Sequence, residues 1–115
     1  MTAKQALKKW VKLFRLQNWT IEMEMHKVYE DEELAGNDGY VRMRVADLWA
    51  LIVIDENSVE PVESIVLHEC LHILLRDATV ALNALFHTPD AENVFSCVNE
   101  LLTRRLERAF EEVME

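Results

Sequence analysis

Glycine, proline and cysteine are scarce in this chain of 115 residues, each occurring only twice. So few glycines and prolines argue against a linker or a low-complexity segment, and we expect one compact domain over residues 1–115. Cys70 and Cys97 are too few for a disulfide framework. No apolar run approaches the roughly 20 residues that a membrane span needs, and no apolar secretory segment opens the chain. We therefore expect a cytoplasmic protein without a membrane partner.

Basic side chains are also in the minority, with 12 lysines and arginines against 21 aspartates and glutamates and a formal net charge of −9. A broad basic surface is the usual electrostatic footprint of a nucleic-acid-binding protein. Two small groups of basic residues, in segments 4–15 and 104–108, fit the solvated faces of amphipathic helices. We expect no nucleic-acid partner.

The first half of the chain alternates between helical and strand patterns. Residues 3–16 place apolar side chains at helical spacing and predict an amphipathic helix. Residues 19–25 and 40–45 alternate apolar and polar side chains, which indicates two half-buried strands. An acidic loop that contains both glycines separates them at 29–39. Residues 50–54 form a short, continuously apolar strand.

Two further helices are expected in the second half. The first begins near Val62 and reaches at least residues 74–76, and the sequence leaves open whether it continues to Leu85. The second follows Thr88-Pro89-Asp90, which has the composition of a helix start. Its apolar side carries Phe95, Val98, Leu102, Leu106, Phe110 and Val113. This order of elements predicts an α+β fold, a small three-stranded sheet with its helices packed against it.

The pentapeptide His68-Glu69-Cys70-Leu71-His72 is an HExxH sequence. On a helix, imidazoles four positions apart share one face and can reach a single ion. Glu69 projects about 100° away around the helix, from where its carboxylate can contact a water at that ion. Burying these groups in so apolar a helix is costly unless they are partnered or hold a metal. We therefore expect a zinc ion (Zn²⁺) at His68 and His72 with Glu69 as catalytic base. The alternative is a pair of core histidines satisfied by hydrogen bonds.

A catalytic zinc site needs a third protein ligand. Glu92 is the preferred candidate, because it lies 20 residues beyond His72 and on the stripe of the last helix expected to face the core. That stripe comprises Phe95, Asn99, Leu102 and Leu106. Glu100 falls nearly opposite the stripe and is the first alternative, followed by His87. An acidic residue in a first helical turn, such as Glu92, also complements the helix dipole without binding a metal.

Three further side chains are candidate hydrogen-bond donors to an oxyanion: Tyr40, His26 and His87. Nothing in the sequence ranks them. Cys70 lies inside the motif but points in a different direction from the two histidines, and we expect it to be a small core residue.

The order of elements, together with segments 64–72 and 92–95, resembles a minimal gluzincin. It is similar to the ImmA/IrrE-type and SprT-like domains, compact metallopeptidase-like proteins that are common in phages and prophages. The resemblance covers most of the chain as an arrangement, but only residues 64–75 and about 92–102 as motif. No histidine stands at the extended metzincin spacing, where the chain has Leu75 and Ala78, and no helix-turn-helix module is evident.

This resemblance implies a zinc ion held by the two motif histidines and a glutamate on the following helix. It also implies Glu69 as general base, and the strand before the motif helix as the sheet edge along which a peptide lies. We therefore expect a zinc-dependent metalloendopeptidase acting on a peptide or protein substrate. The alternative, suggested by the small size and acidic surface, is a non-catalytic, zinc-stabilised protein-binding module derived from a metallopeptidase.

Overall fold

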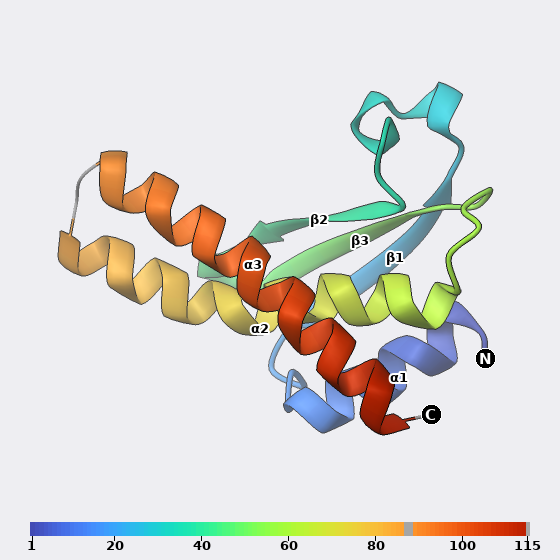
Figure 1. Ribbon diagram of the computed structural model, residues 1–115, viewed down its shortest axis with the longest axis horizontal. Coiled ribbons are helices and arrows are strands. Elements are labelled where there is room, and N and C mark those ends of the chain that lie inside the picture. The colour runs from blue at the N-terminus through green and yellow to red at the C-terminus, as the bar shows by residue number, and fades with distance from the viewer. Residues whose placement is uncertain (87–88, 115) are drawn as a thin grey trace.

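The computed structural model describes the backbone of residues 1–86 and 89–114, and the side chains of residues 1–76, 93, 97 and 99–111. The fold is α+β, as the sequence predicted, with a small mixed sheet and helices packed against it (Figure 1). The helices and strands are α1 (Ala3–Phe14), β1 (Thr20–His26), β2 (Gly39–Arg44), β3 (Trp49–Asp55), α2 (Val62–Phe86) and α3 (Pro89–Met114).

Helix α1 is defined at both ends by local signals. Thr2 and Gln5 form a capping box, in which each side chain accepts a hydrogen bond from the other residue's backbone N–H, so the first turn has its donors satisfied. Arg15 ends the helix in the left-handed conformation, with φ of 56°. The buried face carries Ala6 and Trp10, and Trp10 is thereby fixed in the core.

The three strands are ordered β1-β3-β2, with β1 parallel and β2 antiparallel to β3. The motif helix therefore follows the central strand of the sheet, and the expectation that this strand is a sheet edge is wrong. The continuously apolar segment 50–54 fits this central position, where Ala50, Ile52, Val53 and Ile54 are all fully buried. Among the described residues, the edges of the sheet are β1 and β2.

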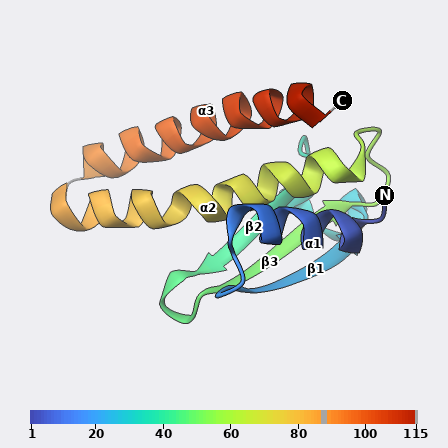
Figure 2. The ribbon, with the colours of Figure 1, turned by 90° about the horizontal axis from the view of Figure 1, so that it is seen from below.

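The helices lie in two layers on one face of the sheet (Figure 2). Helices α1 and α2 lie next to the strands, and α3 runs antiparallel to α2 on the side away from the sheet. The core between sheet and helices includes the buried side chains of Trp10, Ile52, Ile54, Leu67 and Leu71. Helix α2 continues without a break to Phe86. In the described part of the chain, no helix combines the length and apolarity needed to cross a membrane.

The loop between β1 and β2 is anchored by a network around Asp31. Its carboxylate accepts a hydrogen bond from the Tyr40 hydroxyl at 2.5 Å and lies 2.8 Å from His26 Nδ1, while His26 Nε2 lies 2.8 Å from Glu24. The bonds from Tyr40 and His26 lower the pKa of Asp31. The bond to Asp31 raises the pKa of His26, and burial raises the pKa of Tyr40 to about 12. This network fixes the segment that leads into β2.

The pair formed by His26 and Asp31 predicts a pH-dependent contribution to stability. Because the folded pKa of Asp31 is lowered, its contribution is present above the unfolded value of about 3.9 and is lost as the pH falls through the folded value. Because the folded pKa of His26 is raised, its contribution is full below about 6.5 and is lost as the pH rises through the folded value. We expect Asp31→Asn to lower the free energy of unfolding more at about pH 5.5 than at about pH 9. Urea titrations would measure this difference, and equal losses at both pH values would contradict it.

Gly39 allows β2 to pass close to its neighbours. A Cβ atom at this position would lie 2.7 Å from the Val53 carbonyl oxygen and 3.0 Å from Ile65 Cγ2 on α2. Both distances are shorter than ordinary van der Waals contacts, so a larger residue would push β2 away from β3 and α2. The start of β2 is thus held against the helix that carries the motif.

We expect Gly39→Ala to lower the free energy of unfolding by about 1–3 kcal/mol, because overpacking forces backbone shifts. Urea unfolding followed by circular dichroism would measure it. Gly36→Asn is the matched control. A Cβ atom there would meet nothing within 4 Å, and asparagine is among the residues that are least strained at the φ of +80°. A loss in the control as large as in Gly39→Ala would show that the close approach is not the cause.

Candidate metal centre

Helix α2 brings the two motif histidines together on the face that it presents to α3. Their rings are 4.9 Å apart between centroids, and the two Nε2 atoms are 3.2 Å apart. Both side chains are mostly buried, with exposed fractions of 24% for His68 and 18% for His72. The helical spacing of four residues thus produces the convergence of imidazole nitrogens that the sequence predicted.

Glu100 on α3 completes a cluster of three potential metal ligands. Its carboxylate lies 3.0 Å from His72 Nε2 and 3.6 Å from His68 Nε2, and one ligand atom from each of the three residues lies within 4.8 Å of the others. Ligands at the usual zinc distances of 2.0–2.2 Å in tetrahedral geometry are about 3.3–3.6 Å apart. The observed separations are within a few tenths of an ångström of that value.

Each histidine is held in position through its other ring nitrogen. His68 Nδ1 contacts the carboxylate of Glu107, and His72 Nδ1 lies 2.9 Å from Asn99 Oδ1. Thr103 Oγ1 lies 3.4 Å from the same nitrogen of His72. Carboxylate and amide oxygens only accept hydrogen bonds, so these partners place a proton on each Nδ1 and leave the lone pair on Nε2. Metal-binding histidines are oriented by this kind of outer hydrogen bond.

The arrangement of electron pairs fits a divalent cation. Two Nε2 lone pairs and a carboxylate oxygen face one another across about 3 Å, an unfavourable array unless a positive charge lies among them. The set of two imidazoles and one carboxylate is one that catalytic zinc sites use, and it leaves a fourth position open. The residues present therefore fit a zinc ion in both chemistry and spacing.

Electrostatics at the two histidines differ. The hydrogen bond to Glu107 is the largest influence on His68 and raises its pKa. At His72, burial is the largest influence and lowers the pKa. The imidazole of His72 is therefore more readily available as a neutral ligand than the imidazole of His68.

Glu69 is a buried acid without a hydrogen-bond partner among the described residues. It is 4% exposed, and its closest charged neighbour is His68, with Oε1 4.0 Å from Nε2. Burial raises the pKa of its carboxyl group to about 7. A carboxyl group in such an environment is a better proton acceptor than an exposed glutamate.

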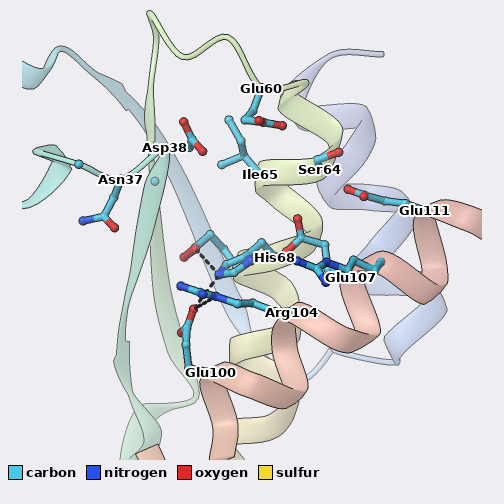
Figure 3. Close-up of a pocket in the computed structure, with 14 residues that line it drawn as sticks. Asn37, Asp38, Glu60, Ser64, Ile65, His68, Glu100, Arg104, Glu107 and Glu111 are labelled. Carbon is cyan, nitrogen blue, oxygen red and sulfur yellow. Dashed lines mark hydrogen bonds and ion pairs between the residues drawn. The ribbon is translucent and has the colours of Figure 1, made fainter. Parts of the chain in front are cut away.

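A cavity of about 450 Å³ opens directly onto these side chains. Its walls come from the segment 36–39 before β2, from α2 and from α3. Figure 3 shows His68, Glu100, Arg104 and Glu107 gathered on one side, with Asp38 across the cavity from them. Two of the candidate ligands, His68 and Glu100, therefore line a space that a substrate can enter, together with Glu69.

The third potential ligand in the structure is Glu100. The prediction that Glu100 points away from the motif is wrong. The stripe on which that prediction depended is right at Asn99, which contacts His72, and at Leu106, which packs against the core, but wrong at Leu102, which is 40% exposed while Thr103 is fully buried. The side chain of Glu92, the preferred candidate, lies outside the described residues. Its backbone precedes Glu100 by eight positions on α3, about 12 Å of helical rise. His87 also lies outside the described residues.

The two described candidate oxyanion donors, Tyr40 and His26, are both engaged with Asp31 and do not line the cavity. Cys70 is fully buried, and burial raises the pKa of its thiol to about 12, so its prediction as a core residue is confirmed. Sequence reasoning placed Asn99 on the inward face of the last helix without giving it a role, and it missed Glu107. Asn99, Thr103 and Glu107 are four residues apart and lie on one face of the helix. This spacing is the signal that could have identified their shared role.

Comparison of the chain with protein-family models, with curated proteins and with solved structures finds no match in any of the three.

We expect protein purified without added metal or chelator to contain about one zinc per chain by elemental analysis, because the site offers three ligands. His68→Ala and Glu100→Ala should each abolish binding. Glu107→Gln should weaken zinc affinity about 10–100-fold, because it loosens the orientation of a ligand. Glu92→Ala is the control and should retain the metal. Loss of zinc in Glu92→Ala but not in Glu100→Ala would mean that the third ligand is misassigned.

Proposed function

We propose that this chain is a zinc-dependent metalloendopeptidase that hydrolyses peptide bonds, with His68, His72 and Glu100 as metal ligands and Glu69 as general base. One observation carries the proposal: the Nε2 atoms of both histidines converge with the Glu100 carboxylate, and His68 and Glu100 line one open cavity together with the buried Glu69.

A zinc ion in such a site supplies Lewis acidity toward water and carbonyl groups. Glu69 has the position and the basicity to move the proton. Its carboxylate lies 4.0 Å from a ligand nitrogen, so a water molecule beside the ligand cluster is within its hydrogen-bonding reach. Burial keeps the pKa of Glu69 close to neutral pH, and the same group can therefore take a proton from water and deliver it to the leaving amine.

The chain's own residues also offer a place for a peptide. The edge of β2 that does not pair with β3 is free among the described residues, and the segment that begins this strand lines the cavity. An extended peptide can add to such an edge through main-chain hydrogen bonds. We propose that β2, rather than the central strand β3, aligns the substrate.

The proposed cellular location is the cytoplasm. Cys70 is buried and Cys97 is exposed, and both are free thiols. Free thiols of this kind are the common state in a reducing compartment.

We expect Glu69→Gln to lower kcat/KM by a factor of about 10²–10⁴, the usual contribution of a general base. The assay would follow cleavage of a library of internally quenched fluorescent peptides by the zinc-loaded chain. Zinc content and melting temperature should not fall, because Glu69 is not a ligand. Glu22→Gln removes an exposed carboxylate on β1 and should leave activity unchanged.

Two results would reject the hydrolase proposal: parent protein that cleaves no better than Glu69→Gln, or no cleavage by either when one zinc per chain is bound. A zinc-stabilised protein-binding module would then be the remaining hypothesis.

A further inference from the structure

A second cavity, of about 390 Å³, lies beside the one that holds the candidate metal ligands. The two cavities share three residues as common walls: Glu60 and Ser64 at the start of α2, and Glu111 on α3. In Figure 3 these three side chains lie at the end of the first cavity remote from Glu100, with the Glu111 carboxylate pointing from α3 toward the start of α2. A ligand that fills the first cavity can therefore extend into the second.

The deeper walls of the second cavity are apolar and aromatic. Trp10 is 2% exposed and Leu67 is 1% exposed, and the Trp10 and Phe110 rings meet edge to face with centroids 6.3 Å apart. The Trp10 indole Nε1 is buried and has no hydrogen-bond partner in the described part of the chain. Such walls accept an aliphatic chain.

The rim of the same cavity is acidic. Of the three carboxylates that line it, Glu63 forms an ion pair with Lys9 at 2.7 Å. Glu60 and Glu111 form no ion pair with any residue that the structure describes. Lys9 also lies 4.7 Å from the centre of the Trp10 ring. The rim therefore offers two carboxylates that have no counter-ion among the described residues, while Lys9 already occupies the neighbouring positions at Glu63 and at the Trp10 ring.

The distance to the candidate metal centre suits a substrate side chain. Ser64 precedes His68 by one helical turn, about 6 Å along α2. Successive residues of an extended peptide advance by about 3.3 Å. A side chain two or so residues from the scissile bond would therefore reach the second cavity.

We infer that the second cavity is a specificity subsite that binds a lysine or arginine side chain of the substrate. This inference rests on the proposed peptidase function and names its substrate class. The aliphatic stem of the side chain packs on Trp10, Leu67 and Phe110, and its charged end pairs with Glu60 and Glu111. A glutamate side chain would face like charges, and a short apolar side chain would leave both carboxylates without a partner.

The test measures binding separately from cleavage, on the full-length chain. The probes are the Nα-acetyl N-methylamides of lysine, norleucine and glutamate, and the readout is the indole N–H resonance of Trp10 in a nitrogen–proton correlation spectrum, assigned with Trp10→Phe. We expect lysine to shift this resonance with a dissociation constant about fivefold lower than norleucine, which matches two partly exposed charge pairs. Glutamate should produce no saturable shift.

Two double variants with the same change in net charge complete the design. In Glu60→Gln/Glu111→Gln the lysine and norleucine constants should become equal. In Glu22→Gln/Glu32→Gln, whose side chains are exposed in β1 and in the loop before β2, the preference for lysine should persist. Equal affinities for lysine and norleucine in the parent would overturn the subsite, as would a lysine preference that survives in Glu60→Gln/Glu111→Gln.

Zinc content and peptide cleavage of the same samples distinguish the two failures. A chain that binds zinc and cleaves peptides without a lysine or arginine preference refutes only the subsite. A chain that shows the lysine preference at Trp10 but neither binds zinc nor cleaves peptides refutes the proposed function and leaves a site for basic side chains.

Discussion

Two imidazole nitrogens that face each other across 3.2 Å, with a carboxylate oxygen 3.0 Å from one of them, impose conditions on everything around them. For both Nε2 lone pairs to face the same point, each Nδ1 atom has to carry the proton and needs a hydrogen-bond acceptor. Both acceptors come from α3. They must be close enough to share one positive charge, so α2 has to remain an unbroken helix through the motif. They must also be partly shielded from water, because a cation held by three ligands competes with its own hydration.

Helix α2 satisfies these conditions because one of its sides is apolar and the other carries polar side chains. The side turned to the sheet and α1 is closely packed and apolar, with Val66, Leu67, Cys70 and Ile73 all at most 1% exposed. The side turned to α3 carries the histidines, and α3 meets it with polar side chains. The usual cost of burying polar groups is offset because each is paired with a partner on the opposing helix. Glu69 is the exception, because it forms no hydrogen bond with any residue that the structure describes and its nearest charged group is His68 at 4.0 Å. A buried acid in this position is a candidate for a chemical role.

The sequence was sufficient for the elements and for the centre of the site, and insufficient for the helix that completes it. Apolar periodicity placed α1, the three strands and the start of α2 within one or two residues, because each packs an apolar face against the core. On α3 the same rule was right for Leu106 and Phe110, which pack against the core, and wrong for Leu102. The structure exposes Leu102 and buries Thr103, because the part of α2 that α3 covers there is polar.

The error on α3 was what displaced Glu100 from first choice. A helix that packs against histidines needs inward-facing oxygens, and a search for apolar stripes cannot find them. The position of β3 was a different kind of error. Its continuous apolar run already indicated a strand with two neighbours, and it was the family resemblance, rather than the residues, that suggested an edge.

All three candidate ligands lie on one helical hairpin, and 28 positions separate His72 from Glu100 along the chain. Bringing them together requires closure of one short connection and no pairing of distant strands, and such closure has a small entropic cost. The parallel pairing of β1 with β3 spans the intervening β2 and is a slower, non-local event. The contacts among the candidate ligands are therefore more local along the chain than those of the sheet. In this architecture the candidate ligands can approach one another before the sheet is complete.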